Sequence, residues 1–159
     1  MFGKSHKDIE ILNKGLDTER FAVAAYELAV CSGLLSERVI QVAKTFQAHH
    51  GQHAHKLHKT IKNLGGTPIK ALPQNEYVKK VPTELIDEKS IIHYALILEK
   101  QAAIAYLNFI PKIENPEIAQ AAASIIGDET MHWAALRNEL GLAPVHISFI
   151  PLSAEEVED

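Results

Sequence analysis

Several ingredients are scarce in this chain, and each shortage argues against a class of protein. The single cysteine, Cys31, excludes an internal disulfide framework and suits a reducing compartment; we expect it to pack as a small apolar residue near a helix end. Aromatic residues make up only 6% of the sequence while alanine is plentiful, which favours helices over strands. No Lys/Arg run indicates nucleic-acid binding, and no apolar run is long enough to span a bilayer.

The length and charge of the chain are unremarkable. Its 159 residues suit one domain with a real core, and the formal net charge of −4 is mild. Residues 1–6 lack the apolar core of a signal peptide. We therefore expect a cytoplasmic location, with export left open if a leader has been removed.

Capping residues and apolar spacing predict four helices. Ser5 and Asp8 resemble a capping box for a first helix that stops near Gly33. Ser36 is a candidate cap for the second helix, and Asn115-Pro116-Glu117 is a strong start for the fourth. The predicted helices run over about residues 7–32, from Ser36 to about 63–66, from 83–87 to before Pro111, and from 116 to about 140.

Residues 66–83 contain three prolines among mixed polar residues, which predicts a long and largely irregular connection. A bundle whose helix pairs are joined by a crossover requires such a link. We therefore predict an all-α fold, an antiparallel four-helix bundle with one long crossover between the second and third helices. The bundle would occupy residues 1–145, and residues 146–159 would form an acidic tail.

Polar side chains interrupt the apolar faces of these helices. His50 and His53 lie three residues apart and therefore share a helix face, and Glu129 and His132 repeat the arrangement in the fourth helix. Gly51 beside them is unfavourable in a helix relative to alanine, and close approach of a neighbouring helix is one reason considered for a glycine there. An unpartnered polar group on such a face is unfavourable. The stripe that carries the two histidines comprises Val39, Val42, Phe46, His50, His53, Leu57, Ile61 and Leu64.

The two halves of the chain repeat one design. Leu16-x-x-Glu19 with Tyr26 matches Leu96-x-x-Glu99 with Tyr106, and His50-x-x-His53 matches Glu129-x-x-His132. In a bundle with one crossover, these side chains would converge in the core, where a metal ion would neutralise them. The alternative is a set of structural polar residues in a metal-free scaffold, but each would then need a partner.

The remaining histidines carry weaker expectations. His49 lies at the edge of the stripe, where it would be either an outer partner of the site or exposed to solvent. We expect His55 and His58 to face solvent, with a weak surface metal site as a minor alternative. His93 lies off the stripe of its helix, and we assign it no role.

From about Ile9 to Gly141 the sequence resembles the ferritin-like superfamily, specifically the small ferritin-like domain proteins of bacteria. Leu96-x-x-Glu99 with Tyr106, and the segment from Ala122 to Arg137, carry the resemblance. The family pattern of Glu and Glu-x-x-His, repeated after a crossover, implies metal ligands at Glu19, His53, Glu99, Glu129 and His132. His50 departs from it, because the family usually has a bridging glutamate there; we include His50 as a sixth ligand.

The resemblance implies a di-iron centre that reacts with O2 or peroxide, an oxidase or ferroxidase, with Tyr26 and Tyr106 as hydrogen-bond or redox partners. Imidazole binds one metal only, so one alternative is a site with a single metal, or with zinc, copper or manganese in place of iron. The other alternative is a helical bundle that binds metal without catalysis or that serves protein contacts. The sequence has no Cys-x-x-Cys pair, and this excludes a fused rubredoxin-type iron centre. A storage cage is not expected, because no short fifth helix is recognisable after Gly141; a homodimer is the assembly considered instead.

Overall fold

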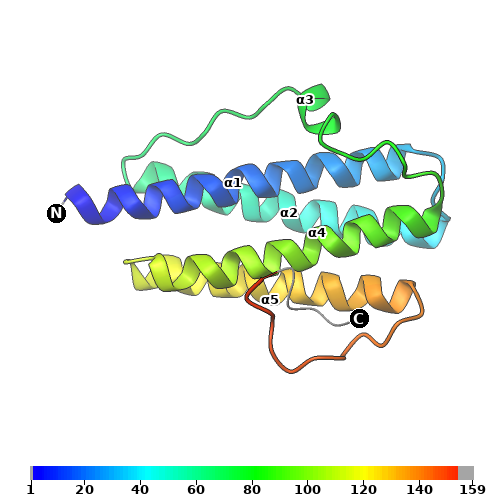
Figure 1. Cartoon of the computed structure of the whole chain (residues 1–159). Helices are drawn as coiled ribbons and strands as arrows, with labels where there is room; N and C mark the ends of the chain where they lie inside the picture. Colours follow the sequence, from blue (N-terminus) through cyan, green and yellow to red (C-terminus); the bar gives the residue numbers. More distant parts are fainter. Residues whose placement is uncertain (1, 154–159) are drawn as a thin grey trace. The chain divides into compact units, whose positions relative to one another are not determined.

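The computed structural model describes residues 2–153, and all regular structure in that range is helical. The chain divides into two compact units, an N-terminal unit of residues 9–91 and a C-terminal unit of residues 2–8 and 92–153. Of the helices described, none is long and apolar enough to cross a membrane. The elements are α1 (Phe2–Cys31), α2 (Glu37–Asn63), α3 (Gln74–Val78), α4 (Glu88–Phe109), the 3-10 helix η1 (Ile110–Lys112) and α5 (Pro116–Glu139) (Figure 1).

The helices end where the sequence predicts. Gly33, Gly65 and Gly141 follow α1, α2 and α5 with φ near +75°, a conformation that glycine adopts without a Cβ clash. At the start of α5, the Asn115 side chain accepts a hydrogen bond of 2.9 Å from the Glu117 N–H, which confirms it as the N-cap. Ser36 occupies the N-cap position of α2, although its side chain makes no capping bond.

The predicted start of the first helix is wrong. The helix begins at Phe2, so Ser5 lies within it instead of preceding it. The carboxylate of Asp8 is buried and accepts hydrogen bonds from the backbone N–H groups of Glu114 (2.9 Å) and Asn115 (3.0 Å). Asp8 therefore satisfies the backbone that leads into α5, and it does not cap its own helix.

In the N-terminal unit, α1 and α2 form an antiparallel pair. Gln47 of α2 contacts Glu27 and the Val23 carbonyl of α1, while residues later in α2 contact earlier residues of α1. Gly51 is exposed, and a Cβ built on it would meet no atom of the described chain within 4 Å, so the close helix approach considered for it is wrong. Cys31 is also exposed, contrary to expectation, with its Sγ 3.8 Å from Glu27 Oε1.

The crossover between α2 and α4 runs alongside α1 and is partly helical. Asn13 Oδ1 accepts a hydrogen bond of 2.6 Å from the Ile69 N–H, and the Arg20 guanidinium donates to the Ile69 carbonyl at 2.6 Å. The buried Tyr77 of α3 donates its hydroxyl to Asp17 at 3.5 Å. Because these three α1 residues share one face of the helix, they bind the crossover along that face. The prediction of a largely irregular link missed α3.

In the C-terminal unit, α4 and α5 lie side by side, with η1 beginning the turn between them (Figure 1). α4 starts one residue after the predicted interval and ends before Pro111, as predicted. After α5 the chain turns back: the Arg137 guanidinium donates to the Ala143 carbonyl at 2.7 Å, and the Asn108 side chain donates to the Leu152 carbonyl at 3.1 Å. Residues 141–153 contain no helix, as expected. The end of the predicted acidic tail, residues 154–159, lies outside the described residues.

Candidate metal centre

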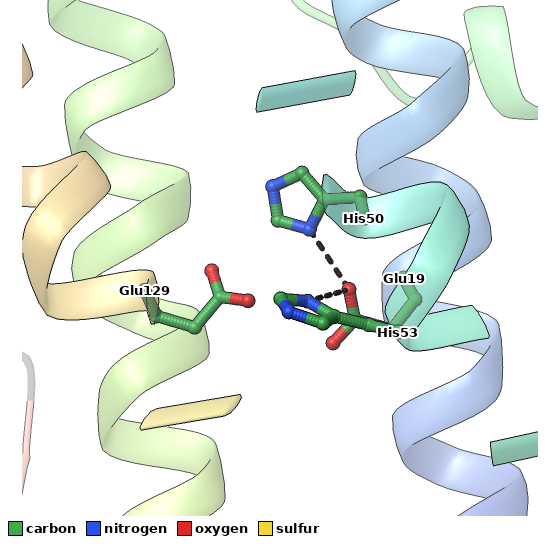
Figure 2. A group of neighbouring side chains, drawn as sticks. All are labelled: Glu19, His50, His53 and Glu129. Atoms are coloured by element: carbon green, nitrogen blue, oxygen red, sulfur yellow. Dashed lines mark hydrogen bonds and ion pairs between the residues drawn. The ribbon is translucent and has the colours of Figure 1, made fainter. Parts of the chain in front are cut away.

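The N-terminal unit brings one carboxylate and two imidazoles together. Oε2 of Glu19 on α1 lies 2.8 Å from Nδ1 of His50 and 3.3 Å from Nδ1 of His53, both on α2. Figure 2 shows both rings directed toward this carboxylate. Glu19 and His50 are 1% and 2% exposed, and the His53 side chain is 14% exposed. We call these three residues the Glu-His-His cluster.

Hydrogen bonding keeps the Glu19 carboxylate ionised despite its burial. Burial is the largest influence and raises the pKa of Glu19, because a charged group loses its hydration. The hydrogen bonds and positive potential of His50 and His53 together outweigh it, so the pKa of Glu19 lies below its usual 4.5. The cluster therefore holds an anionic oxygen and two ring nitrogens around one point. A cation can replace the shared protons there.

Aromatic contacts fix the His50 ring from its other side. Tyr26, which is buried, stacks on His50 with ring centroids 5.6 Å apart and planes 24° apart. Phe46 meets Tyr26 edge-on at 6.0 Å, and His53 meets His50 edge-on at 5.9 Å. These contacts restrict rotation of His50 and hold its Nδ1 toward Glu19.

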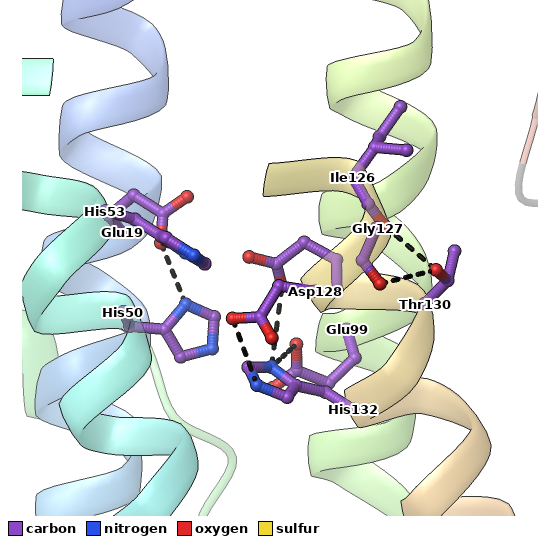
Figure 3. A network of polar contacts seen from close by, with 10 residues as sticks. Glu19, His50, His53, Glu99, Ile126, Gly127, Asp128, Thr130 and His132 are labelled. Atoms are coloured by element: carbon purple, nitrogen blue, oxygen red, sulfur yellow. Dashed lines mark hydrogen bonds and ion pairs between the residues drawn. The ribbon is translucent and has the colours of Figure 1, made fainter. Parts of the chain in front are cut away.

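The C-terminal unit contains a second cluster, with two glutamates and one histidine. Nδ1 of His132 on α5 lies 3.2 Å from Oε2 of Glu99 on α4 and 3.9 Å from Oε2 of Glu129 on its own helix. All three side chains are at least 98% buried. Figure 3 shows the His132 ring between Glu99 and a further carboxylate. We call Glu99, Glu129 and His132 the Glu-Glu-His cluster.

That further carboxylate is Asp128, which the sequence interpretation missed. Its Oδ2 lies 3.5 Å from Nε2 of His132 (Figure 3). An acid on that side favours the tautomer that carries its proton on Nε2, and it thereby leaves Nδ1 available to a metal. The signal was the spacing, because Asp128 and His132 are four residues apart on one helix and therefore share a face.

Aligned by position, the α2 and α5 segments that supply these ligands differ at two of three positions. Asp128-Glu129-x-x-His132 stands in one, and His49-His50-x-x-His53 stands in the other. The N-terminal cluster thus offers one carboxylate and two imidazoles, while the C-terminal cluster offers two carboxylates and one imidazole with Asp128 behind it. The first suits a borderline-soft ion, and the second suits a harder one.

The other predicted residues fall where helical phase puts them. His55 and His58 are exposed, as predicted, and His93, to which no role was assigned, is exposed as well. His49 is half-buried, between the two environments considered for it. Tyr106 is buried in the C-terminal unit, where its ring meets Phe109 edge-on at 6.3 Å.

Each cluster fits a metal ion by its donor chemistry. Glu19, His50 and His53 offer ligand atoms that lie within 4.8 Å of one another, and so do Glu99, Glu129 and His132. Carboxylate oxygens and imidazole nitrogens are the donors that iron, manganese, zinc and copper take in proteins. Buried carboxylates also need a compensating positive charge. Convergence of both clusters in one centre stays a prediction.

Comparison with known proteins agrees with the helical fold. The sequence model described as the ferritin-like domain matches residues 7–142. A crystal structure of ferritin-like, diiron-carboxylate proteins from Bacillus anthracis is similar, with a TM-score of 0.70 and 23% identity over 88% of this chain and 99% of that chain. A conserved hypothetical protein from Mycobacterium tuberculosis gives a TM-score of 0.74 and 18% identity over 94% and 99%. Among curated proteins, none matches significantly. The structural likenesses confirm the predicted all-α, ferritin-like bundle.

Proposed function

The chain belongs to the ferritin-like domain family, and from that premise we propose that it is an iron-binding protein whose centre oxidises Fe(II) with O2 or peroxide. We propose that the Glu-His-His and Glu-Glu-His clusters are its metal ligands and that the chain holds two ions. The similar structure from Bacillus anthracis, described as a diiron-carboxylate protein, supports iron by analogy alone.

One observation carries the proposal: six buried or nearly buried ligand side chains form two compact clusters, one in each unit, among mainly apolar buried residues. Without a cation, the Glu-Glu-His cluster concentrates two carboxylates around a single imidazole, with Asp128 behind it. Buried negative charge of that density destabilises a fold unless positive charge compensates it. A divalent ion supplies that charge.

The protein's own groups would define the coordination. Glu19, His50 and His53 would hold one ion, and Tyr26 would keep His50 in its present rotamer. Asp128 would hold the His132 proton on Nε2. Iron bound in this way would supply the one-electron chemistry that dioxygen and peroxide require, whereas the side chains bind, orient and exclude water.

We assign Tyr26 and Tyr106 as the aromatic partners of the centre. Both phenols are buried, and they occupy matching positions in the two halves of the chain, seven residues after Glu19 and Glu99. Tyr26 contacts the cluster directly through the His50 ring. A buried phenol near a metal can donate a hydrogen bond or an electron, and Tyr→Phe variants separate this role from packing.

Metal analysis of protein purified without a His-tag is the first test. We expect close to two ions per chain after loading with Fe(II) under argon, and O2 consumption when air is admitted. His132→Ala should lower iron content and oxidation rate, whereas the exposed His55→Ala should change neither. No bound metal after loading would contradict the proposal and favour a metal-free scaffold. Bound iron without O2 or peroxide consumption would leave a passive binder.

The second candidate is a non-catalytic site for zinc, copper or manganese. His50 favours it, because an imidazole at this position removes a carboxylate and gives the N-terminal cluster two nitrogen donors. Competition between Fe(II), Mn(II) and Zn(II) at equal free concentration distinguishes the two. Stronger retention of zinc, together with absent Fe(II) oxidation, would favour this second function.

We further propose that the protein is cytoplasmic and forms a homodimer. Its binding partners would be metal ions and O2 or peroxide. Sedimentation of purified protein tests the assembly. A large hollow particle would instead indicate a storage cage.

A further inference from the structure

The C-terminal unit contains a cavity beside α5, apart from the Glu-Glu-His cluster. This cavity of about 150 Å3, open to solvent on one side, lies between α5 and the segment that turns back after it, which Figure 1 draws in orange to red. Apolar cavities of this volume are large enough to bind benzene. Its lining is mainly apolar and includes Trp133, Ala134, Val145, His146, Ile147 and Phe149.

Two nitrogen atoms of residues that line this cavity are buried without a hydrogen-bond partner. They are Nε1 of Trp133 and Nε2 of His146, and neither has a partner among residues 2–153. Trp133 is 5% exposed, and its ring meets that of His146 edge-on with centroids 5.6 Å apart. An indole N–H always donates, and a neutral imidazole donates from one nitrogen. Buried donors of this kind are normally satisfied, so their pairing at a cavity points to an acceptor that comes from outside the chain.

Of the two other polar residues in the lining, Ser148 is exposed and Thr130 is already engaged. The Thr130 hydroxyl donates within α5, where it lies 2.8 Å from the Gly127 carbonyl and 3.0 Å from the Ile126 carbonyl (Figure 3). Trp133 and His146 therefore supply the recognition, while the apolar lining supplies the contact area.

The charges nearby favour an anionic acceptor. Burial lowers the pKa of His146 below 6.5, and the positive charges of Arg137 and Lys100 lower it further. The same positive potential that discourages a proton on His146 attracts a negative ligand group. His146 is accordingly neutral near pH 7, and in the tautomer that carries its proton on Nε2 it can donate to a ligand without the imidazole carrying charge.

We propose that this cavity binds a small monocarboxylate with an aromatic or branched aliphatic body, whose carboxylate accepts hydrogen bonds from Trp133 Nε1 and His146 Nε2. The ring or branch would fill the apolar part of the cavity. Entry requires the rim to shift, because both nitrogens are covered; Val145 and Phe149 are 85% and 86% exposed and are held by little packing.

The experiment uses benzoate as the probe and the full-length protein at pH 7. Trp133 is the only tryptophan in the chain, so its fluorescence reports on the cavity directly. We expect a saturable change with benzoate and a binding at least about tenfold weaker with benzyl alcohol, which lacks the charge. No saturable change with benzoate or isovalerate would overturn the proposal. Equal binding of benzene and benzoate would overturn the carboxylate assignment.

Variants locate the binding. His146→Leu should weaken benzoate binding by about tenfold, because a hydrogen bond to the carboxylate is lost, and His146→Gln should retain part of it. Ala134→Leu, which fills the cavity, should abolish the response. His93→Ala, exposed on α4, is the matched control and should bind benzoate as the parent does. Circular dichroism verifies folding of each variant, and a folded His146→Leu with unchanged affinity would contradict the site.

Metal content separates this inference from the proposed function. None of the four variants changes a residue of the Glu-His-His or Glu-Glu-His cluster, so iron content should equal that of the parent. Benzoate binding that survives removal of metal would establish the cavity as a site of its own. Loss of benzoate binding on metal removal would contradict a recognition that rests on Trp133 and His146 alone.

Discussion

The Glu-His-His and Glu-Glu-His clusters occupy equivalent places in two halves of one repeat, yet they differ in charge. In the first, one glutamate oxygen serves two imidazoles at 2.8 and 3.3 Å. In the second, one imidazole contacts two glutamates and an aspartate at distances of 3.2 to 3.9 Å. In the first cluster, hydrogen bonds from the two imidazoles largely compensate the negative charge of Glu19. The second has excess negative charge and therefore depends more on a cation.

The glutamate on the first helix of each half gives the largest contrast. Glu19→Gln removes the only carboxylate of its cluster, whereas Glu99→Gln leaves Glu129 in place. We expect metal affinity at the first cluster to fall by about a hundredfold or more and at the second by about tenfold, since even outer partners of a metal site contribute 10–100-fold. Titration with Fe(II) or Zn(II) measures both. Equal losses would show that the two clusters do not differ in this way.

His50 is the position where the contrast can be removed. His50→Glu makes the first cluster resemble the second, and we expect it to raise iron retention and the Fe(II) oxidation rate several-fold. His50→Ala should lower metal content or stoichiometry instead, and His55→Ala on the opposite helix face should leave both unchanged. If His50→Ala binds as much metal as the parent, His50 is not a ligand and the remaining five residues form the site.

Asp128 provides a test of the comparison in the second cluster. Asp128→Asn keeps the shape but weakens the hold on the Nε2 proton of His132, so metal affinity at that cluster should fall by about tenfold. The matched change in the first half, His49→Asp, places an acid at the equivalent position and should strengthen binding there. Histidine NMR signals report the tautomer of His132 directly. An unchanged tautomer and affinity in Asp128→Asn would remove Asp128 from the positioning role.

Acid should affect the metal and the apo fold in separate pH windows. Ligand imidazoles must be neutral, so metal should be released as pH falls toward and below about 6. The pKa of Glu19 is lowered in the folded chain, so its contribution to stability is complete above the unfolded value of 4.5 and is lost as pH falls through the folded value. Chelator should therefore lower the Tm at pH 7 and have little effect near pH 5. A chelator effect of equal size at both would contradict the first window.

The smallest effects concern two exposed helical glycines, one in each half. Gly51 lies in α2 and Gly127 in α5, and an added Cβ would meet no described atom within 4 Å at either position. Each Gly→Ala change should therefore stabilise the fold by up to about 1 kcal/mol, measured by urea unfolding. Gly66→Ala is the contrasting control and should destabilise, because its Cβ would lie 2.9 Å from Ile9 Cδ1. Destabilisation by Gly51→Ala would indicate a close approach that the structure lacks.

Local spacing was sufficient to predict much of this protein. Helical phase assigned His50 and His53 to one buried face and His55 to the opposite one, because the 3.6-residue period of a helix is a property of nearby residues alone. Repetition of that phase in the second half identified Glu99 and His132. The ends of α2 and α5 followed from glycine and asparagine in the same local way.

Only the tertiary structure decided which distant groups meet. The sequence around Asp8 predicts that it caps its own helix, but its carboxylate accepts hydrogen bonds from backbone N–H groups more than a hundred residues away. Tyr77 became buried because the crossover lies on Asp17 and its neighbours, and Trp133 and His146 became the wall of a cavity because the chain turns back after Gly141. Such pairings depend on how elements pack, and the sequence around each residue carries no period that encodes its distant partner.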